Sequence, residues 1–327
     1  MAKPVVCIVS TGGTIASKFD ASLGGHAAAA SADELVASVP GLGELADLRA
    51  VEHSRVNSAV IDTPTVFALR DRLDGLLADD GVAGAVVTHG TATLEETAYL
   101  LDLTLRTDKP VVVTGAQRDF DERDADGPRN ISYAVKIAAD PASAGRGVLV
   151  SLGGQIHVAR NAVKADTQSL DAFGSRDGGK IGIVSKDGVI YFARPDRRVR
   201  LAVDHVKENV QLAVYTQGAN DLLLRACIER RVDGIVVDAV GSGNMNLPWY
   251  GAVRDALQAG IPVVISSRHL GGPPHISKGY RGSLKSVVEL GAIPGGYLSG
   301  IKARILLMVA LAHTRERDRL ADIFARA

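Results

Sequence analysis

The sequence is poor in cysteine, carries no excess of either charge and lacks a long apolar run. Its two cysteines, Cys7 and Cys227, are too few for a disulfide framework or a cysteine metal cluster. Lysine plus arginine and aspartate plus glutamate each total 37, so nothing favours binding to nucleic acid or to an anionic membrane. No stretch reaches the roughly 18 to 20 apolar residues that cross a membrane. A small molecule is therefore the expected partner.

The amino-terminal segment and the cysteines bear on where the protein works. The segment MAKPVVCIVSTGG contains one lysine and an apolar run of about six residues, shorter than the apolar region of a signal peptide. Isolated cysteines suit a reducing compartment. The sequence therefore predicts a soluble, cytoplasmic protein.

The length and the hydrophobic pattern together predict two domains. At 327 residues the chain exceeds the usual size of a single core. Short β-branched runs alternate with helical patterns, as in βαβ units around a parallel sheet that is buried on both faces. The pattern weakens over 191–209, which is charged and contains Pro195. We expect an α/β protein with a larger domain over 1–190, whose mostly parallel sheet is flanked by helices, a linker over 191–209, and a smaller α/β domain over 210–327.

Individual elements can be bounded in both halves. A capping box from Ser31 to Glu34, and Thr63 as a hydroxyl cap before Pro64, predict two helix starts, while the small, glycine-bearing segment 17–30 predicts a mobile flap. The other predicted elements of the first half are Val5–Ser10, Ala85–Thr88, 94–106, Val111–Thr114, 130–139 and Val148–Leu152. Those of the second half are Val210–Tyr215, 219–230, Gly234–Val240, 249–259, Pro262–Ser266 and 300–313.

The first candidate site is the turn Thr11-Gly12-Gly13-Thr14, which follows the first predicted strand. Its glycines permit positive φ and its threonines can bond to backbone groups, so a purely structural turn accounts for it. A phosphate cradle is disfavoured because neither GxGxxG nor GxxxxGK is present. The functional alternative makes Thr14 a nucleophile, with its hydroxyl facing a ligand at the carboxyl edge of the sheet.

A second hydroxyl-bearing loop, Thr88-His89-Gly90-Thr91, follows another predicted strand. Thr91 or Thr93 could simply cap the next helix, and a lone histidine such as His89 is more typical of a hydrogen-bonded structural residue. Two such loops at adjacent strand ends nevertheless favour a shared cleft. Lys164 is by default a solvated lysine, and it becomes a candidate base if burial lowers its pKa. No further ligand at suitable spacing supports a metal site.

Taken together, these motifs resemble the bacterial-type L-asparaginases and glutaminase-asparaginases along essentially the whole chain. The resemblance implies a larger amino-terminal and a smaller carboxyl-terminal α/β domain, hydrolysis of L-asparagine or a related amide without a cofactor, and a homotetramer with active sites between the subunits of an intimate dimer. The segments that carry it are TGGTIA at 11–16, THGTATLEETAYLLDLT at 88–104, KPVVVTGAQR at 109–118, ADGPRNISYAV at 125–135, RGVLV at 146–150, ARNAVKADTQSLDAF at 159–173, DGIVVDAVGSGN at 233–244 and KARILL at 302–307.

The resemblance also implies roles for particular residues. Thr14 falls where the family has the nucleophile that attacks the carboxamide of the substrate and forms an acyl-enzyme. Thr91 and Lys164 fall on two members of a second catalytic triad. Gly13 and Gly90 fall at substrate-binding positions beside them.

Three further positions are implied as substrate contacts. Ser58 falls where a hydroxyl binds the α-carboxylate of the substrate, and Ala116 where a backbone carbonyl meets the leaving amide. Asn244 corresponds to a residue that the neighbouring subunit contributes.

The chain departs from the family pattern where that pattern binds the α-ammonium of the substrate. Ala92 replaces the aspartate of THGTDT, which completes the triad and contacts the ammonium, and Ala59 stands where close homologues commonly have glutamine. A glutamate that some members supply across the dimer falls at Leu284 or a neighbouring position. The flap offers Phe19 where the family often has tyrosine. Because a buried ammonium without a carboxylate is strongly unfavourable, the site is expected to discriminate against a free α-amino acid.

Three interpretations follow from these departures. In the first, the chain is an asparaginase-like amidohydrolase whose substrate has lost or masked its α-ammonium. In the second, it is an ordinary L-asparaginase or glutaminase that was inactivated by an engineered change of aspartate to Ala92. In the third, it is a non-catalytic protein that binds a small molecule. The persistence of Thr14, Thr91 and Lys164 disfavours the third, and the loss of more than one ammonium contact favours the first over the second.

Overall fold

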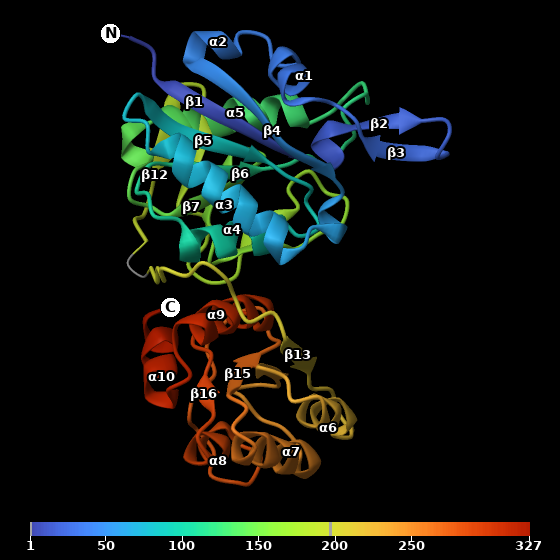
Figure 1. Ribbon diagram of the computed structural model, residues 1–327, viewed down its shortest axis with the longest axis vertical. Helices are drawn as coiled ribbons and strands as arrows, with labels where there is room; N and C mark the ends of the chain where they lie inside the picture. Colours follow the sequence, from blue (N-terminus) through green and yellow to red (C-terminus); the bar gives the residue numbers. More distant parts are fainter. Residues whose placement is uncertain (1, 196–197) are drawn as a thin grey trace. The chain divides into compact units, whose positions relative to one another are not determined.

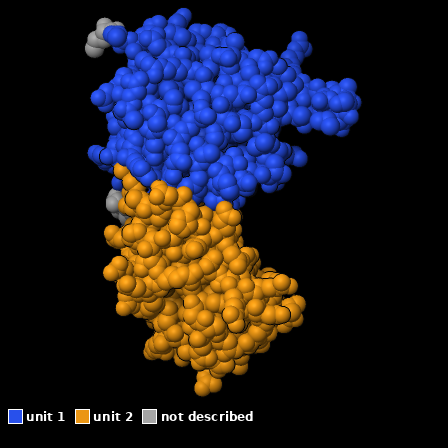
Figure 2. Space-filling model, in the orientation of Figure 1, with its two compact units in different colours: residues 1–196 blue, residues 197–327 orange. Residues whose placement is uncertain are grey.

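A computed structural model describes residues 2–195 and 198–327 of the chain. The chain divides into two compact units, residues 1–196 and 197–327, which Figure 2 shows in blue and orange. The division lies within 191–209, the segment that the sequence predicts as a linker, although Tyr191 still belongs to the last strand of the first unit. Within the described ranges, no helix is both long and apolar enough to span a membrane.

The first unit is built on an eight-stranded sheet whose order is β12-β11-β8-β7-β6-β5-β1-β4. In chain order these strands are β1 (Val5–Gly12), β4 (Asp47–Val56), β5 (Val82–Thr88), β6 (Val111–Thr114), β7 (Val148–Leu152), β8 (Gln155–Val158), β11 (Gly182–Ser185) and β12 (Gly188–Tyr191). The five strands from β7 to β4 are parallel, and β8, β11 and β12 continue the sheet in antiparallel pairs. The predicted, mostly parallel sheet is thus confirmed.

Helices cover both faces of this sheet (Figure 1). On one face lie α1 (Ala32–Ala37), α2 (Leu42–Leu45) and α5 (Gly127–Ala139), whose apolar side chains share a core with Val6 and Ile8 of β1. On the other face lie α3 (Thr63–Leu77) and α4 (Leu94–Thr104), which contact β5, β6 and β7. Burial on both faces explains why β1 and β5 are continuous runs of valine, isoleucine and alanine rather than alternating patterns.

The predicted helix starts are confirmed at one position and corrected at another. Ser31 and Glu34 form a complete capping box at α1. At α3 the N-cap is Asp62 rather than Thr63, because Asp62 is extended and its carboxylate accepts the backbone N–H of Thr65 at 2.9 Å. Thr63 already lies inside the helix, and Pro64 occupies its first turn, where a missing N–H costs nothing.

Smaller elements complete the first unit. The segment that predicts a flap forms an antiparallel hairpin, β2 (Ser17–Asp20) and β3 (Gly25–Ala28), which projects from the sheet in Figure 1. A second antiparallel pair consists of β9 (Ala162–Lys164) and β10 (Phe173–Ser175). Three short 3-10 turns are η1 (Thr14–Ala16), η2 (Ser58–Val60) and η3 (Pro141–Ser143).

The second unit repeats the βαβ arrangement on a smaller scale. Its parallel sheet has the order β13 (Val210–Val214), β14 (Gly234–Ala239), β15 (Val263–Ser267) and β16 (Ile293–Pro294). The helices are α6 (Leu222–Glu229), α7 (Leu247–Gln258), α8 (Leu284–Glu289), α9 (Gly300–His313) and α10 (Arg317–Arg326). The fully buried Trp249 packs edge-on against Tyr215 at 5.2 Å within the core that α7 and α8 form on one face of the sheet.

Candidate functional site

Three loops leave the same edge of the larger sheet. Strands β1, β5 and β6 are parallel neighbours, with Ser10 beside Thr88 and Thr88 beside Thr114. Their carboxyl ends therefore open into adjacent loops at 12–14, 89–92 and 115–117. The half-buried Thr14 begins η1, two residues after the end of β1. Thr14 therefore lies at the carboxyl edge of the sheet.

Two glycines bring the first two loops into direct contact. Gly13 has φ 81° and ψ −175°, and a Cβ built on it would lie 2.2 Å from Gly90 Cα. A Cβ on Gly90 would in turn lie 2.6 Å from Ser58 Oγ. Only glycine permits such a close approach, so both positions require a glycine. The structure thereby groups Gly13, Gly90 and Ser58, and places Thr14 and Thr91 on loops that touch.

A hydrogen-bonded cluster links Thr91, Lys164 and a residue that the sequence reasoning missed, Gln117. Lys164 Nζ donates to Thr91 Oγ1 at 2.7 Å and to Gln117 Oε1 at 3.0 Å. Thr91 Oγ1 donates to the same Gln117 oxygen at 3.0 Å. Thr91 is buried and Lys164 is half-buried at the end of β9. Gln117 lies inside the motif KPVVVTGAQR, and its place directly after a neighbouring strand was the available signal.

The hydroxyls of the second loop bond to the site rather than to the following helix. Thr93 is the N-cap residue of α4, but its hydroxyl donates to the carbonyl of Ser58 at 2.7 Å instead of accepting a helical N–H. Thr91 bonds to Gln117. The interpretation of these threonines as simple helix caps is therefore wrong, and their hydroxyls tie the Ser58 loop and the lysine cluster to one edge of the sheet.

Burial lowers the pKa values of Lys164 and His89. Removal from water lowers the pKa of the Lys164 ammonium below its usual value, and the negative charge of Asp166 partly opposes this effect. Burial lowers the pKa of His89 to about 4, so that the imidazole is neutral at pH 7. His89 Nδ1 donates to the carbonyl of Gly90 at 2.8 Å, which fits the structural role expected for it.

A second layer of hydrogen bonds fixes the loop that carries Ala116 and Gln117. The backbone N–H groups of Gln117 and Arg118 both donate to Asp126, at 3.1 and 3.0 Å. Asn130 Nδ2 donates to Asp126 Oδ2 at 3.0 Å and to the carbonyl of Gly115 at 2.9 Å. Ala116 is buried within this loop. The loop therefore has a defined conformation, which orients the Gln117 side chain toward Lys164.

The remaining predicted positions differ in their surroundings. Ala92 and Ala59 are both exposed, on the loops that carry Thr91 and Ser58. Asn244 lies in the second unit, between β14 and α7, where its Nδ2 donates to Ser242 Oγ at 3.4 Å. The missing glutamate was expected at Leu284 or a neighbouring position. Leu284 is only 2% exposed and packs in the core of the second unit, which leaves the neighbouring positions as the alternative.

The flap contacts the loop that follows Gln117. Phe19 is 59% exposed and meets the ring of His26 edge-on at 5.6 Å. His26 lies 3.5 Å from carboxylate oxygens of both Asp119 and Asp121, and the Phe19 backbone N–H donates to Asp121 at 2.8 Å. The hairpin directly after Thr14 is therefore attached to the strand-end loop that carries Gln117.

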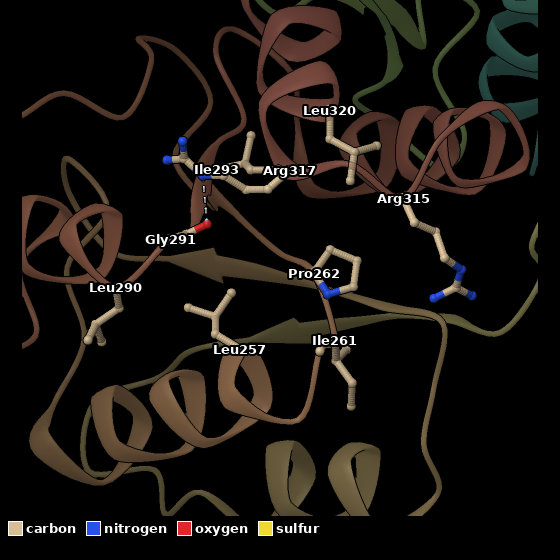
Figure 3. A pocket seen from close by; sticks show the side chains of 10 residues that line it. Leu257, Ile261, Pro262, Leu290, Gly291, Ile293, Arg315, Arg317 and Leu320 are labelled. Carbon is tan, nitrogen blue, oxygen red and sulfur yellow. Dashed lines mark hydrogen bonds between the residues drawn. The ribbon is translucent and has the colours of Figure 1, made fainter.

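A pocket in the second unit, shown in Figure 3, is chemically unlike this site. Arg315 pairs there with Asp233, and Arg317 Nε donates to the carbonyl of Gly291 at 3.4 Å. The apolar part of the lining is contributed by Leu257, Ile261, Pro262, Leu290, Ile293 and Leu320. None of the predicted site residues lines it, and its arginines are already engaged. We therefore assign the candidate site to the strand ends of the first unit. Within residues 2–195 and 198–327, no group of three or more His, Cys, Asp and Glu side chains could hold a metal ion.

The fold and the cluster define a two-domain α/β protein with hydroxyl and amine groups at its strand ends, an arrangement suited to nucleophilic hydrolysis. More specifically, the chain belongs to the asparaginase family, which confirms the resemblance. The family model for the N-terminal asparaginase domain matches residues 5–197. The model for the glutaminase/asparaginase C-terminal domain matches residues 209–324.

Individual relatives cover almost the whole chain. L-asparaginase 2 of Bacillus subtilis is 33% identical over 331 residues, which cover 98% of this chain and 86% of the relative. A probable L-asparaginase of Deinococcus radiodurans is 35% identical, with 99% and 98% covered. The crystal structure of a probable cytoplasmic L-asparaginase from Campylobacter jejuni superposes with a TM-score of 0.89 at 30% identity, covering 99% of this chain and all of the other.

Proposed function

We propose that this chain hydrolyses a carboxamide, L-asparagine or a related amide, to a carboxylate and ammonia, with Thr14 as the nucleophile. The observation that carries the proposal is the 2.7 Å hydrogen bond between Lys164 and Thr91, on a loop that touches the loop of Thr14. Membership of the asparaginase family supports the same reaction. A pure binding protein would have no use for a partly desolvated amine beside two hydroxyl-bearing loops.

The chemistry assigns a proton path to each group. The Thr14 oxygen attacks the carboxamide carbon, and its proton leaves toward the basic cluster of Thr91 and Lys164. Collapse of the tetrahedral intermediate breaks the C–N bond while the cluster returns that proton to the nitrogen, so ammonia leaves and an acyl-enzyme remains. Water then gives a proton to the cluster and attacks the acyl carbon; the acid is released as its carboxylate, and the cluster returns the proton to Thr14. A lysine can act as the base in this sequence only when its amine is neutral, which the lowered pKa of Lys164 favours.

The substrate is inferred from what surrounds the cluster. In the described part of the chain, both hydrogen-bond acceptors of Lys164 Nζ are neutral, and the position that the family pattern gives to an aspartate is the methyl of Ala92. A free α-ammonium would find one carboxylate fewer there. We therefore favour an amide whose α-ammonium is absent or acylated, with Ser58 binding the carboxylate that remains.

Ammonia release from an amide panel tests the proposed function. The panel contains asparagine, glutamine, succinamate and N-acetylasparagine. We expect Thr14→Ala to abolish the activity and Thr14→Ser to retain part of it, because serine keeps the hydroxyl. Thr216→Ala, which removes an exposed hydroxyl in the second unit, is the matched control. Folded wild-type protein that releases no ammonia from any member of the panel would contradict the proposal.

We further infer that Asn244 completes the site of another subunit in a homotetramer built from intimate dimers. Light scattering tests the assembly, and mixing two inactive variants tests the shared site. Thr14→Ala and Asn244→Ala chains, unfolded and refolded together, are expected to recover about a quarter of wild-type activity, since random pairing gives some sites both intact residues. An active monomer, or no recovery from a mixture with tetramers of both chains, would refute the shared site.

The cytoplasm is the location that we propose for this chain. Cys7 is buried and Cys227 half-buried, and both are free thiols, which suits a reducing compartment. The Campylobacter jejuni relative is described as cytoplasmic, whereas a Haemophilus influenzae relative is described as periplasmic. Fractionation of cells that express the native gene distinguishes the two locations.

A further inference from the structure

The side chain of Gln117 has one orientation that satisfies all its neighbours. Its Nε2 donates to the carbonyl of Ser169 at 3.0 Å, while its Oε1 accepts from Lys164 and from Thr91. The opposite orientation would turn an NH2 group toward the ammonium and an oxygen toward the Ser169 carbonyl, so both contacts would be repulsive. The amide oxygen is therefore held at the centre of the cluster.

This oxygen serves the cluster in both protonation states of the lysine. When Lys164 is an ammonium, it donates to Gln117 and to Thr91, as the observed distances describe. After the ammonium loses a proton, the amine keeps an N–H for Gln117 and can turn its lone pair toward the Thr91 hydroxyl. The amide thus fixes the position of the amine without supplying a proton of its own.

An amide and a carboxylate at this position would differ in charge rather than in reach. A carboxylate 3 Å from an ammonium stabilises the protonated form strongly, whereas a neutral amide does so only through its dipole. Among the described titratable groups, Asp166, two residues after Lys164, is the one whose charge raises the pKa of Lys164. The lowering of that pKa by burial is the larger effect.

We propose that Gln117 is a positioning residue that holds the Lys164 amine against Thr91 without a negative charge, so that the amine can accept the Thr91 proton. The inference rests on the proposed function and deepens it, because it adds to the lysine cluster a neutral member that the family resemblance did not assign. No further atom is needed for the step. The Thr91 O–H bond breaks and an N–H bond forms on Lys164, while Thr91 receives the proton that Thr14 gives up.

Competitive labelling of the lysine tests this inference without requiring turnover. Only the neutral amine reacts with an acylating reagent, so the rate of Lys164 modification against pH, read by peptide mass spectrometry, gives the midpoint of its titration. Gln117→Glu adds a charge with little change of shape, and we expect it to raise that midpoint by about 1 to 3 pH units. In any active variant, the midpoint of the rise of kcat with pH should shift upward by the same amount.

Two further variants separate charge from shape. Gln168→Glu makes the same chemical change on the exposed part of the Ser169 loop, and we expect a much smaller shift. Gln117→Met keeps the length but removes the acceptor, so the Lys164 midpoint should not rise, while kcat should fall by about 10- to 100-fold with KM less affected. Melting temperatures of all three variants establish that they are folded.

The outcomes separate the two proposals. A Gln117→Glu chain that titrates at Lys164 like Gln168→Glu would overturn the role of Gln117, as would wild-type kcat in Gln117→Met. If the wild-type protein hydrolyses no amide of the panel, the proposed function fails, yet the labelling midpoints still report whether Gln117 keeps the lysine free of a negative partner.

Discussion

Replacing Gly13 by alanine should separate the two loops that form the site. An alanine Cβ would lie 2.2 Å from Gly90 Cα and 2.3 Å from Gly90 N. Both are backbone atoms, so no side chain can rotate away. Ordinary contacts between carbon atoms are about 3.5 to 4 Å long, and the loops would therefore have to move apart by about 1 Å.

Two energetic terms add at Gly13. Its φ of 81° with ψ of −175° lies in a region essentially confined to glycine, and an alanine held there costs about 1 to 3 kcal/mol. Overpacking against Gly90 adds about 1 to 3 kcal/mol. We therefore expect Gly13→Ala to lower the free energy of unfolding by about 2 to 6 kcal/mol. A displacement of about 1 Å between Thr14 and the Thr91 cluster should lower kcat/KM on the order of 10²-fold.

The control is a glycine that shares the positive φ but not the contact. Gly260 has φ of +76°, and in the described part of the chain no atom lies within 4 Å of a Cβ built on it. Gly260→Ala should lower stability by only about 1 kcal/mol and leave kcat/KM unchanged. Urea unfolding and ammonia release are measured for both variants. If Gly13→Ala retained wild-type kcat/KM, the contact between the two loops would not position the reacting groups.

The other predictions concern charge, pH and the flap. If the site is adapted to a substrate without a free ammonium, Ala92→Asp should lower kcat/KM on the best panel substrate, with little gain on asparagine; a gain on asparagine of the order of 10² or more would instead identify Ala92 as a lesion. The pKa of His89 is about 4 in the folded chain and 6.5 in the unfolded chain. As the pH falls, the unfolded chain therefore binds a proton at His89 before the folded chain does. The free energy of unfolding consequently decreases between pH 6.5 and pH 4, by about 2 kcal/mol at pH 5. Urea unfolding at pH 7 and pH 5 should show a smaller loss in His89→Gln, and an equal loss would contradict this assignment. Asp121→Asn weakens the contacts between the loop after Gln117 and the hairpin. We expect faster proteolysis at Phe19 and a higher KM, with unchanged stability in urea. A proteolysis rate equal to that of the wild type would refute the attachment.

The sequence predicted the central strands because their burial leaves a direct mark in composition. Strands β6 and β7 have the same bounds as the strands that the sequence predicts, Val111–Thr114 and Val148–Leu152. Strand β4 was missed because it reads DLRAVEHSRV, in which charged residues alternate along a half-exposed edge of the sheet. The antiparallel strands β8, β11 and β12 are four residues each, too short for a period to emerge. The hairpin at 17–28 contains no valine, isoleucine or threonine, so the β-propensity of its residues does not predict two strands.

The candidate site could be predicted only as far as it lies in local motifs. The turns at Thr14 and Thr91 combine glycine and threonine directly after strands, which is a recognisable pattern. Gln117 has a weaker local signal, its place after strand β6, because its role depends on contacts with Lys164 and Ser169 from a later part of the chain. Correspondence alone placed the missing glutamate at Leu284 or a neighbour, and only the structure shows that Leu284 itself is a core side chain.

Two neutral residues of the site, Ala92 and Gln117, bear on the charge of Lys164. On the proposed correspondence with the family pattern, Ala92 removes one possible carboxylate near the amine, and Gln117 supplies an acceptor without adding another. Both features favour the neutral amine, and burial acts in the same direction. An aspartate at position 92 would reverse this effect, because its charge would stabilise the ammonium while providing a partner for the α-ammonium of an amino acid. Under the proposed function, recognition of a free amino acid and easy deprotonation of Lys164 compete for one charge, and we infer that alanine at position 92 and glutamine at position 117 favour the second.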